Sequence, residues 1–146
     1  MDYAPEAAIR RYLPEFGRWF RRELSAGRLW GYVAETATHE PVGGGLLWLQ
    51  PRLPSPRFSQ RVGPYIFSVY TDPAHRGHGI ATRLVAALVD SAAARGYVRV
   101  ELHSTEVGRH VYERLGFEPT TQMRKVLPGR SSSSRTARRP GGRSGS

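Results

Sequence analysis

The sequence contains no cysteine and only one lysine. The absence of cysteine excludes disulfide bonds, thiolate metal sites and cysteine nucleophiles, and is compatible with a reducing compartment. No apolar run approaches the roughly 20 residues that a membrane-spanning helix needs. The first 20 residues mix acids and arginines without an uninterrupted apolar stretch, so no secretory signal is visible. We therefore expect a cytoplasmic protein without a membrane segment.

Acidic residues are also scarce. The chain has 12 Asp and Glu against 22 Lys and Arg, a formal net charge of +10. Such a balance invites a nucleic-acid partner. However, residues 129–146 carry five of the arginines and no acid, so half of the excess charge lies in this short segment.

The 146 residues, of which 39% are hydrophobic and 10% aromatic, suffice for one folded domain. Residues 129–146 contain no side chain larger than alanine that could enter a core. Their serine, glycine and arginine cannot offset the entropy cost of ordering. We therefore expect a single domain over residues 1–128 and a disordered tail over residues 129–146.

The spacing of apolar residues predicts the elements of this domain. Ile9 to Leu24 keep helical spacing, and Pro14 predicts a kink or a division into two short helices. The strong turn residue Gly96 predicts the end of a second helix. The other expected elements are strands over 29–37 and 42–50 forming a hairpin, a central strand over 65–71, a helix over 79–95, a strand over 98–103, a helix over about 109–116 and a last strand over 120–127. This order predicts an α/β or α+β sheet with helices on its faces.

The segment T-D-P-A-H-R-G-H-G-I-A-T, residues 71–82, joins the central strand to the second helix. Gly77 and Gly79 allow backbone N–H groups to turn toward one point, and a helix N-terminus follows directly. Orphan amides and the positive end of the helix dipole then favour an anion. Arg76 and Arg83 add positive charge. The segment predicts a site for phosphate or pyrophosphate.

Several known phosphate-binding motifs require residues that this segment lacks, which narrows the choice of phosphate ligand. A nucleoside triphosphate loop needs a lysine after its second glycine, but Lys125 lies far downstream. A dinucleotide fingerprint needs a third glycine where Thr82 stands. Lys125, in an expected terminal strand, is a poor candidate for a pyridoxal Schiff base. The pattern that remains is R-x-x-G-x-A over residues 76–81, after a strand and opening a helix.

This pattern resembles motif A of the GCN5-related N-acetyltransferases, Q/R-x-x-G-x-G/A. Three further segments resemble the same family and occur in the family's order along the chain. V-G-G-G-L-L-W (residues 42–48) resembles the family's third strand, and V-Y-E-R-L-G-F (residues 111–117) resembles its motif B. L-H-S-T-E-V-G-R (residues 102–109) resembles the segment that connects strand and helix in one branch of the family. The resemblance covers roughly residues 29–127. It implies a mixed, mostly antiparallel sheet whose central strands splay apart, flanked by helices. The family's first strand has no counterpart here, and an exposed sheet edge would favour pairing in a homodimer.

The resemblance further implies an acetyl-CoA-dependent N-acetyltransferase, without a metal, that acetylates a primary amine by direct attack in a ternary complex. Backbone groups of Val69, Tyr70 and Thr71 are implied to hold the pantetheine arm between the splayed strands. The implied pyrophosphate contacts are the amides of Gly77, His78, Gly79, Ile80, Ala81 and Thr82, with Arg76 and Arg109 as further cofactor-binding residues.

Tyr112 matches the family tyrosine that protonates the departing thiolate, although it could simply pack with neighbouring apolar residues. The acceptor amine must lose a proton before attack. Glu101 and His103 lie on one face of the expected strand and are the candidates to take that proton. An ordinary surface role is an equal alternative for both. Glu106 is expected near a helix start, as a capping residue.

The loop over residues 51–64 contains Arg52, Arg57 and Arg61. It could line the acceptor site and favour a carboxylate or phosphate group, or it could be an unstructured connection. His75 and His78 lack carboxylate partners, which makes them a thin metal signal.

The acceptor itself stays open between a small amine, an amino acid, an antibiotic and a protein amine, because loops set acceptor specificity. The competing hypothesis is a basic nucleic-acid-binding or scaffold protein with this fold and no catalysis. Against it, the tail has no aromatic residue to stack on bases, so we expect at most non-specific contacts with nucleic acid.

Overall fold

The structure is a computed structural model that describes residues 6–129. Residues 130–146, where a disordered tail was expected, lie outside the described residues. The elements in chain order are α1 (Glu6–Ser25), β1 (Leu29–Glu35), β2 (Pro41–Pro51), β3 (Val62–Thr71), the 3₁₀ turn η1 (Pro73–His75), α2 (Ile80–Ala94), β4 (Glu101–Leu102) and α3 (Arg109–Arg114).

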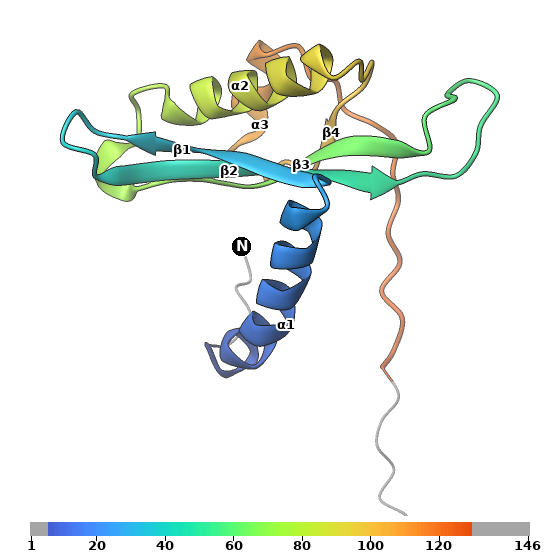
Figure 1. The fold of residues 1–146 in the computed structure, drawn as a ribbon, viewed down its shortest axis with the longest axis horizontal. Coiled ribbons are helices and arrows are strands. Elements are labelled where there is room, and N and C mark those ends of the chain that lie inside the picture. The colour runs from blue at the N-terminus through green and yellow to red at the C-terminus, as the bar shows by residue number, and fades with distance from the viewer. Residues whose placement is uncertain (1–5, 130–146) are drawn as a thin grey trace, which may run out of the picture.

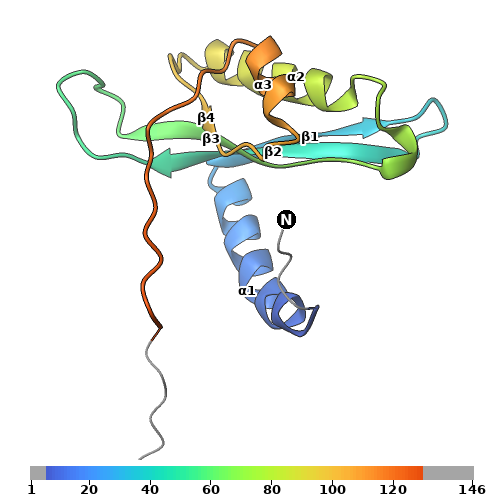
Figure 2. The same ribbon diagram turned by 180° about the vertical axis from the view of Figure 1, so that it is seen from behind.

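The four strands form one sheet in the order β1-β2-β3-β4. The first three strands pair antiparallel, and β3 pairs with β4 in parallel. Helices α2 and α3 lie on one side of this sheet, and α1 lies on the other side (Figures 1 and 2). This confirms the expected α+β architecture with a mixed, mostly antiparallel sheet.

The main core lies between the sheet and α2. Leu47 of β2 and Ile66 of β3 are buried against Val85 and Leu88 of α2. Gly45 allows this approach, because a Cβ atom there would lie 3.1 Å from the Leu88 side chain, closer than most real Cβ contacts. Apolar burial by these residues fixes α2 across the strands and therefore fixes where its N-terminus points.

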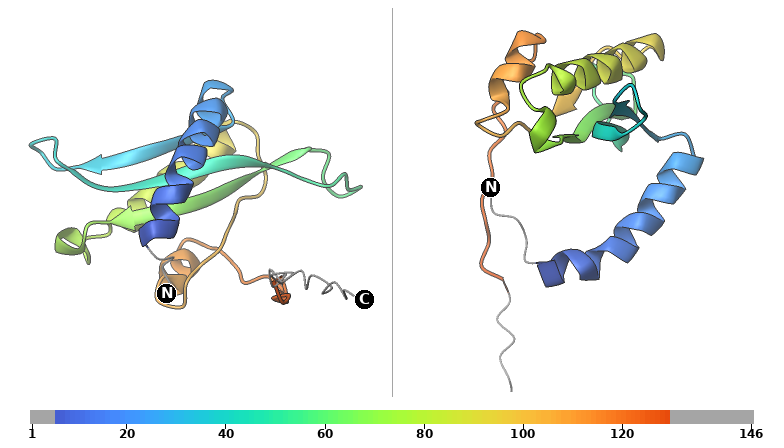
Figure 3. Two further views of the ribbon diagram at one scale, coloured as in Figure 1. Left: turned by 90° about the horizontal axis from the view of Figure 1, so that it is seen from below. Right: turned by 90° about the vertical axis from the view of Figure 1, so that its left-hand side faces the viewer.

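Helix α1 is one unbroken helix, so of the two alternatives expected at Pro14, a kink or a division, the division is wrong. Figure 3 shows it as a curved helix whose C-terminal end lies at the sheet and whose N-terminal end extends away from the sheet. Pro14 is tolerated because this part of the helix is exposed, and water can bond the carbonyl that the proline leaves without a donor. Tyr12 and Leu13 are 59% and 55% exposed, so much of the apolar stripe does not reach the sheet.

The C-terminal end of α1 is attached to the sheet by aromatic and ionic contacts. The Trp19 ring packs edge-on against Trp48, with centroids 5.3 Å apart. Glu23, only 6% exposed, accepts hydrogen bonds from Arg28 Nε at 2.8 Å and Nη2 at 3.0 Å, and from Trp48 Nε1 at 3.1 Å. Hydrogen bonding, first from Arg28 and then from Trp48, lowers the pKa of Glu23 to about 2. These contacts join α1, β1 and β2.

The C-terminal part of the sheet is shorter than predicted. Only Tyr65 and Ile66 of β3 pair with β4, opposite Glu101 and Leu102. The strand expected over 120–127 is absent, and this segment runs as exposed chain away from the sheet (Figure 2). A strand forms only where a sheet edge accepts its hydrogen bonds, and this segment pairs with no strand of the sheet.

No helix within residues 6–129 is both long and apolar enough to cross a membrane.

Candidate active site

A bulge interrupts the pairing of β3 with β2, close to the point where the pairing of β3 with β4 ends. Gly44 pairs with Tyr70 and Leu46 pairs with Phe67, so Ser68 and Val69 both lie opposite Gly45. Ser68 adopts a left-handed φ of 52°. A bulge bends its strand and redirects the residues that follow. Because the pairing with β4 ends at Ile66, the second half of β3 leaves its edge open toward the connection that follows β4.

A groove of about 1030 Å³ occupies this opening. We call it the large groove. Its walls are the second half of β3, the turn between η1 and α2, and the segment from His103 to α3. The expected cofactor residues that line it are Val69, Tyr70, Thr71, Arg76, Gly77, Gly79, Ile80, Ala81 and Thr82. The structure therefore brings together nearly all of the motif A residues and the end of β3.

The turn before α2 has the geometry of an anion site. Gly77 and Gly79 have φ angles of 82° and 74°, a conformation that side chains with a Cβ rarely adopt. Gly79 is the N-cap of α2, and no side chain satisfies the first amides of the helix. These amides and the helix dipole thus face the large groove without a protein partner. The left-handed conformation, rather than a tight contact, explains both glycines.

The turn is held by its own hydrogen bonds. Asp72 Oδ1 accepts from the Ala74 amide at 2.9 Å, and the Asp72 amide donates to the Val42 carbonyl at 2.7 Å. Arg76 Nε donates to the Thr71 carbonyl at 3.3 Å. Thr71 Oγ1 and His75 Nδ1 are buried without a hydrogen-bond partner, and both residues line the large groove. Free amides and these two polar atoms fit a ligand that carries phosphate and amide groups.

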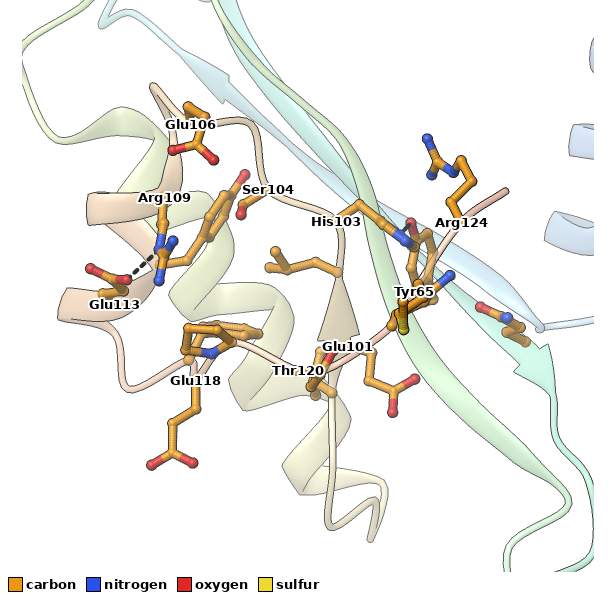
Figure 4. Close-up of a pocket in the computed structure, with 18 of the residues that line it drawn as sticks. Tyr65, Glu101, His103, Ser104, Glu106, Arg109, Glu113, Glu118, Thr120 and Arg124 are labelled. Carbon is orange, nitrogen blue, oxygen red and sulfur yellow. Dashed lines mark hydrogen bonds and ion pairs between the residues drawn. The ribbon is translucent and has the colours of Figure 1, made fainter. Parts of the chain in front are cut away.

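A second cavity of about 800 Å³, the small groove, lies beside the first. Figure 4 shows its side chains, which come from β2, β3, β4, α3 and the segments before and after α3. Trp48 and Tyr65 form an aromatic wall, and Glu101 and Arg124 add charge. His103, Glu106 and Tyr112 line both grooves. A ligand in one groove and a ligand in the other would therefore meet at these residues.

Tyr112 is half-buried in α3 and packs edge-on against Phe117, with ring centroids 5.9 Å apart. The packing alternative considered for Tyr112 is thus present in the structure, together with a position between the two grooves. Burial raises the pKa of Tyr112 above its ordinary value. The hydroxyl therefore keeps its proton at neutral pH, as a proton donor must.

The two candidates for the proton acceptor have different surroundings. Glu101 forms ion pairs with Arg99 at 3.2 Å and Arg52 at 3.5 Å. His103 is hydrogen-bonded through Nδ1 to the hydroxyl of Tyr65. The sequence did not point to Tyr65, because its position opposite Glu101 depends on the register between two strands far apart in the chain.

Three expected site residues lie away from the large groove. Arg109 lines the small groove instead, where Glu113 binds its Nε at 2.6 Å and raises its pKa. Glu101 also faces the small groove alone. His78 lies in the turn but does not line the groove, and its Nδ1 contacts the His75 carbonyl at 3.1 Å.

Glu106 does not cap α3. The N-cap is Gly108, which lacks a side chain, and the hydroxyl of Thr105 accepts a hydrogen bond from the Gly108 amide at 3.1 Å. Thr105 can accept this bond because its short side chain lies three residues before the amide, the usual reach of a Ser or Thr cap. Glu106 is left with its carboxylate exposed beside both grooves.

The arginine-containing loop is a structured hairpin extension, and its arginines line neither groove. The Arg52 amide donates to the Arg61 carbonyl at 2.8 Å, and Arg99 lies 4.0 Å above the Phe58 ring. The expectation of an unstructured connection is therefore wrong, and the loop arginines do not line the large or the small groove. Its arginines are drawn instead toward the carboxylate of Glu101 and toward solvent.

A mixed sheet whose strands β3 and β4 part, with a glycine turn that opens the helix behind them, is the arrangement that the sequence resemblance implied. The family model for acetyltransferases of the GNAT family matches residues 1–117. The chain belongs to this family of N-acetyltransferases, which confirms the family, the fold and the class of enzyme that the sequence predicted.

Solved structures and curated proteins include clear relatives. A GCN5-related N-acetyltransferase from Ralstonia eutropha JMP134 is 31% identical, with a TM-score of 0.76 over 86% of this chain and 82% of that chain. A predicted acetyltransferase from Clostridium acetobutylicum, solved with acetyl-CoA, shares the fold at 24% identity, with a TM-score of 0.74 over 87% of this chain and 79% of that chain.

A glucosamine 6-phosphate N-acetyltransferase from Trypanosoma brucei brucei is 34% identical over 91 residues, which make up 60% of each chain. The match thus spans about three fifths of the curated relative.

Proposed function

We propose that this protein is an acetyl-CoA-dependent N-acetyltransferase that acetylates a primary amine by direct attack in a ternary complex. The observation that carries the proposal is the meeting of two grooves at Tyr112 and His103. One groove begins at an anion-binding turn, and the other is an aromatic and charged cavity of a size for a small acceptor. Two substrates can then lie end to end without a covalent enzyme intermediate.

The large groove is the proposed cofactor site. Acetyl-CoA, when bound, supplies the acetyl thioester. The free edge of β3 at Val69, Tyr70 and Thr71 offers backbone groups to the pantetheine arm. The amides from Gly77 to Thr82 bind the pyrophosphate, and Arg76 adds charge at the same turn. Arg109 would contribute only after leaving Glu113, so we place it second to Arg76.

Tyr112 is the proposed proton donor to the departing sulfur, and His103 or Glu101 takes the proton that the amine loses. As the amine nitrogen forms its bond to the acetyl carbon, the carbon–sulfur bond breaks and Tyr112 protonates the thiolate. From ordinary pKa values of about 10 for tyrosine and 8.5 for a thiol, this transfer is uphill by about 2 kcal/mol. The raised pKa of Tyr112 increases that difference. Positioning of the sulfur beside the hydroxyl has to compensate.

The small groove is the proposed acceptor site. The name of the Trypanosoma relative makes glucosamine 6-phosphate the first acceptor to test. Arg124, which lines this groove, is the group that could bind its phosphate.

Two measurements test the proposed function. Acetyl-CoA should raise the melting temperature, since a ligand at 100 times its Kd stabilises the folded state by about 2.7 kcal/mol. A mass-spectrometric screen over a panel of amines that includes glucosamine 6-phosphate should then show an acetylated product. A melting temperature that acetyl-CoA leaves unchanged would contradict the proposal.

A further inference from the structure

We propose that Tyr65 is a positioning residue that orients His103 as the proton acceptor of acetyl transfer. This inference rests on the proposed function and deepens it, because it chooses His103 over Glu101 and adds a residue from another strand. The observation is the hydrogen bond between the Tyr65 hydroxyl and His103 Nδ1, which joins β3 to the segment after β4 (Figure 4).

The position of His103 in the sheet explains why it needs this partner. Glu101 and Leu102 are the only residues of β4, and His103 follows at the point where the strands part. The sheet therefore does not hold the His103 backbone. Its ring packs against the Tyr65 ring, with centroids 5.6 Å apart at 61°, and Tyr65 in turn stacks on Phe67 at 6.4 Å. Strand pairing fixes the position of Tyr65, and its contacts with His103 restrict the orientation of the His103 ring.

Glu101 is less suited to the role, although it lies on the same face. Its carboxylate is already engaged by the guanidinium groups of Arg52 and Arg99. It also lines the small groove alone, whereas His103 lines both grooves. A proton acceptor has to lie within hydrogen-bond reach of the amine as that amine approaches the thioester, which is the place where the grooves meet.

The direction of this hydrogen bond decides which imidazole nitrogen can act, because a tyrosine hydroxyl can donate or accept. A neutral imidazole accepts a proton at Nε2 only when Nδ1 carries the hydrogen. In the proposed arrangement the Tyr65 oxygen accepts that Nδ1 hydrogen and leaves the Nε2 lone pair free for the amine proton. When Nε2 is protonated, the Nδ1–H bond to Tyr65 becomes charge-assisted and therefore stronger. Burial raises the pKa of Tyr65, so the phenol itself stays neutral.

Other charged and titratable groups face His103 across the small groove. They are Glu101 of β4, Glu106 of the connection before α3, Arg109, Tyr112 and Glu113 of α3, and Glu118 and Arg124 of the segment after α3. Arg109 and Glu113 pair with each other. Replacing Tyr65 by phenylalanine removes the hydroxyl and leaves all of these charges in place, so the variant isolates the hydrogen bond.

The first test reads the His103 tautomer directly and needs no substrate. In nitrogen–proton correlation spectra of the neutral imidazole, assigned with His103→Ala, we expect the Nδ1-protonated form in the wild type. Tyr65→Phe should change His103 to the Nε2-protonated form that free histidine prefers. Tyr32→Phe, on the outer strand β1, is the matched control and should leave the spectrum unchanged. An Nε2-protonated His103 in the wild type would overturn the proposal.

The second test uses acetyl-CoA with glucosamine 6-phosphate. Tyr65→Phe should lower kcat by roughly 10- to 100-fold and leave the KM for acetyl-CoA unchanged. Adding Tyr65→Phe to His103→Ala should cause no further loss. Independent, multiplying losses would show that Tyr65 does not act through His103.

The two proposals fail in different ways. A wild-type protein that does not respond to acetyl-CoA contradicts the proposed function. A wild-type protein that binds acetyl-CoA but holds His103 in the Nε2-protonated form contradicts only the role of Tyr65. If glucosamine 6-phosphate is not acetylated, the tautomer measurement decides the role of Tyr65 alone.

Discussion

Tyr112 lies where the two grooves meet, and it has two possible roles, in proton transfer and in packing. The two roles depend on different parts of the side chain. Its ring packs on Phe117 and on the core, which any aromatic residue could do. Its hydroxyl serves neither contact. A role in proton transfer therefore depends on the hydroxyl alone, whereas a structural role depends on the ring.

Tyr112→Phe is expected to keep the fold and the response to acetyl-CoA while lowering kcat by roughly 100-fold or more, the usual contribution of a general acid. Steady-state kinetics and thermal unfolding with and without acetyl-CoA measure the two effects. Tyr97→Phe, a tyrosine that lines neither groove, serves as the control. An unchanged kcat in Tyr112→Phe would leave packing as the whole role of this residue.

Gly79 allows a second test at single-residue scale, because Gly96 offers a matched control. Both have left-handed φ angles, 74° and 85°, and neither has an atom within 4 Å of a Cβ position. Glutamate at either position should cost about 1–2 kcal/mol of stability. Only Gly79→Glu, which brings a negative charge to the turn, should abolish the rise in melting temperature that acetyl-CoA causes. Equal responses in both variants would argue against an anion site at the turn.

At the scale of elements, α1 depends on a small number of contacts at its C-terminal end. Most of its length is exposed, and Figure 3 shows it standing clear of the sheet except at that end. Glu23 is the polar centre of this attachment, since it binds Arg28 of the following turn and Trp48 of β2. Trp48 also lines the small groove, so the attachment supports one wall of the proposed acceptor site.

The lowered pKa of Glu23 predicts a loss of stability in acid. The folded-state pKa of about 2 lies below the ordinary value of 4.5, so the unfolded chain takes up this proton first as the pH falls. The contribution is complete above pH 4.5 and is lost as the pH falls toward about 2. Glu23→Gln should lower the free energy of unfolding near neutral pH, and its deficit relative to the wild type should shrink over this range.

Urea denaturation at a series of pH values measures this difference. Glu15→Gln, which removes an exposed carboxylate from the same helix, is the matched control and should follow the wild type. A deficit in Glu23→Gln that stays constant down to about pH 2 would mean that the Glu23 carboxylate does not carry the pH dependence.

At the scale of the whole molecule, the net charge of +10 is divided between two parts of the chain. Part of it lies on the folded domain around a turn that suits phosphate groups. The rest lies in residues 129–146, which carry five arginines and no acid. A nucleic-acid-binding function would draw on that segment, whereas acetyl transfer would not.

Removing residues 129–146 should therefore leave the response to acetyl-CoA intact. Any binding of DNA by the full chain should weaken steeply between about 50 and 200 mM salt, as phosphate contacts do, and should be lost in the shortened chain. Fluorescence anisotropy with labelled DNA and thermal unfolding with acetyl-CoA measure the two properties. Sequence-specific, salt-resistant binding by the shortened chain would instead favour the nucleic-acid hypothesis.

Local patterns were sufficient for the parts of the fold that local rules govern. The hairpin of β1 and β2, the two-sided apolar strand β3, and α2 between Gly79 and Gly96 follow from periodicity and from turn residues. The turn before α2 follows from two glycines that need left-handed conformations. Each of these features depends on residues that are neighbours along the chain.

The tertiary structure decided the features that depend on partners distant in sequence. The strand expected over residues 120–127 does not form, because the segment pairs with no sheet edge, and the arginines of the loop line neither groove. Tyr65 meets His103 only because the register sets Tyr65 opposite Glu101. Short-range rules thus determined the elements and the phosphate turn, whereas strand pairing and side-chain packing decided which residues share a groove.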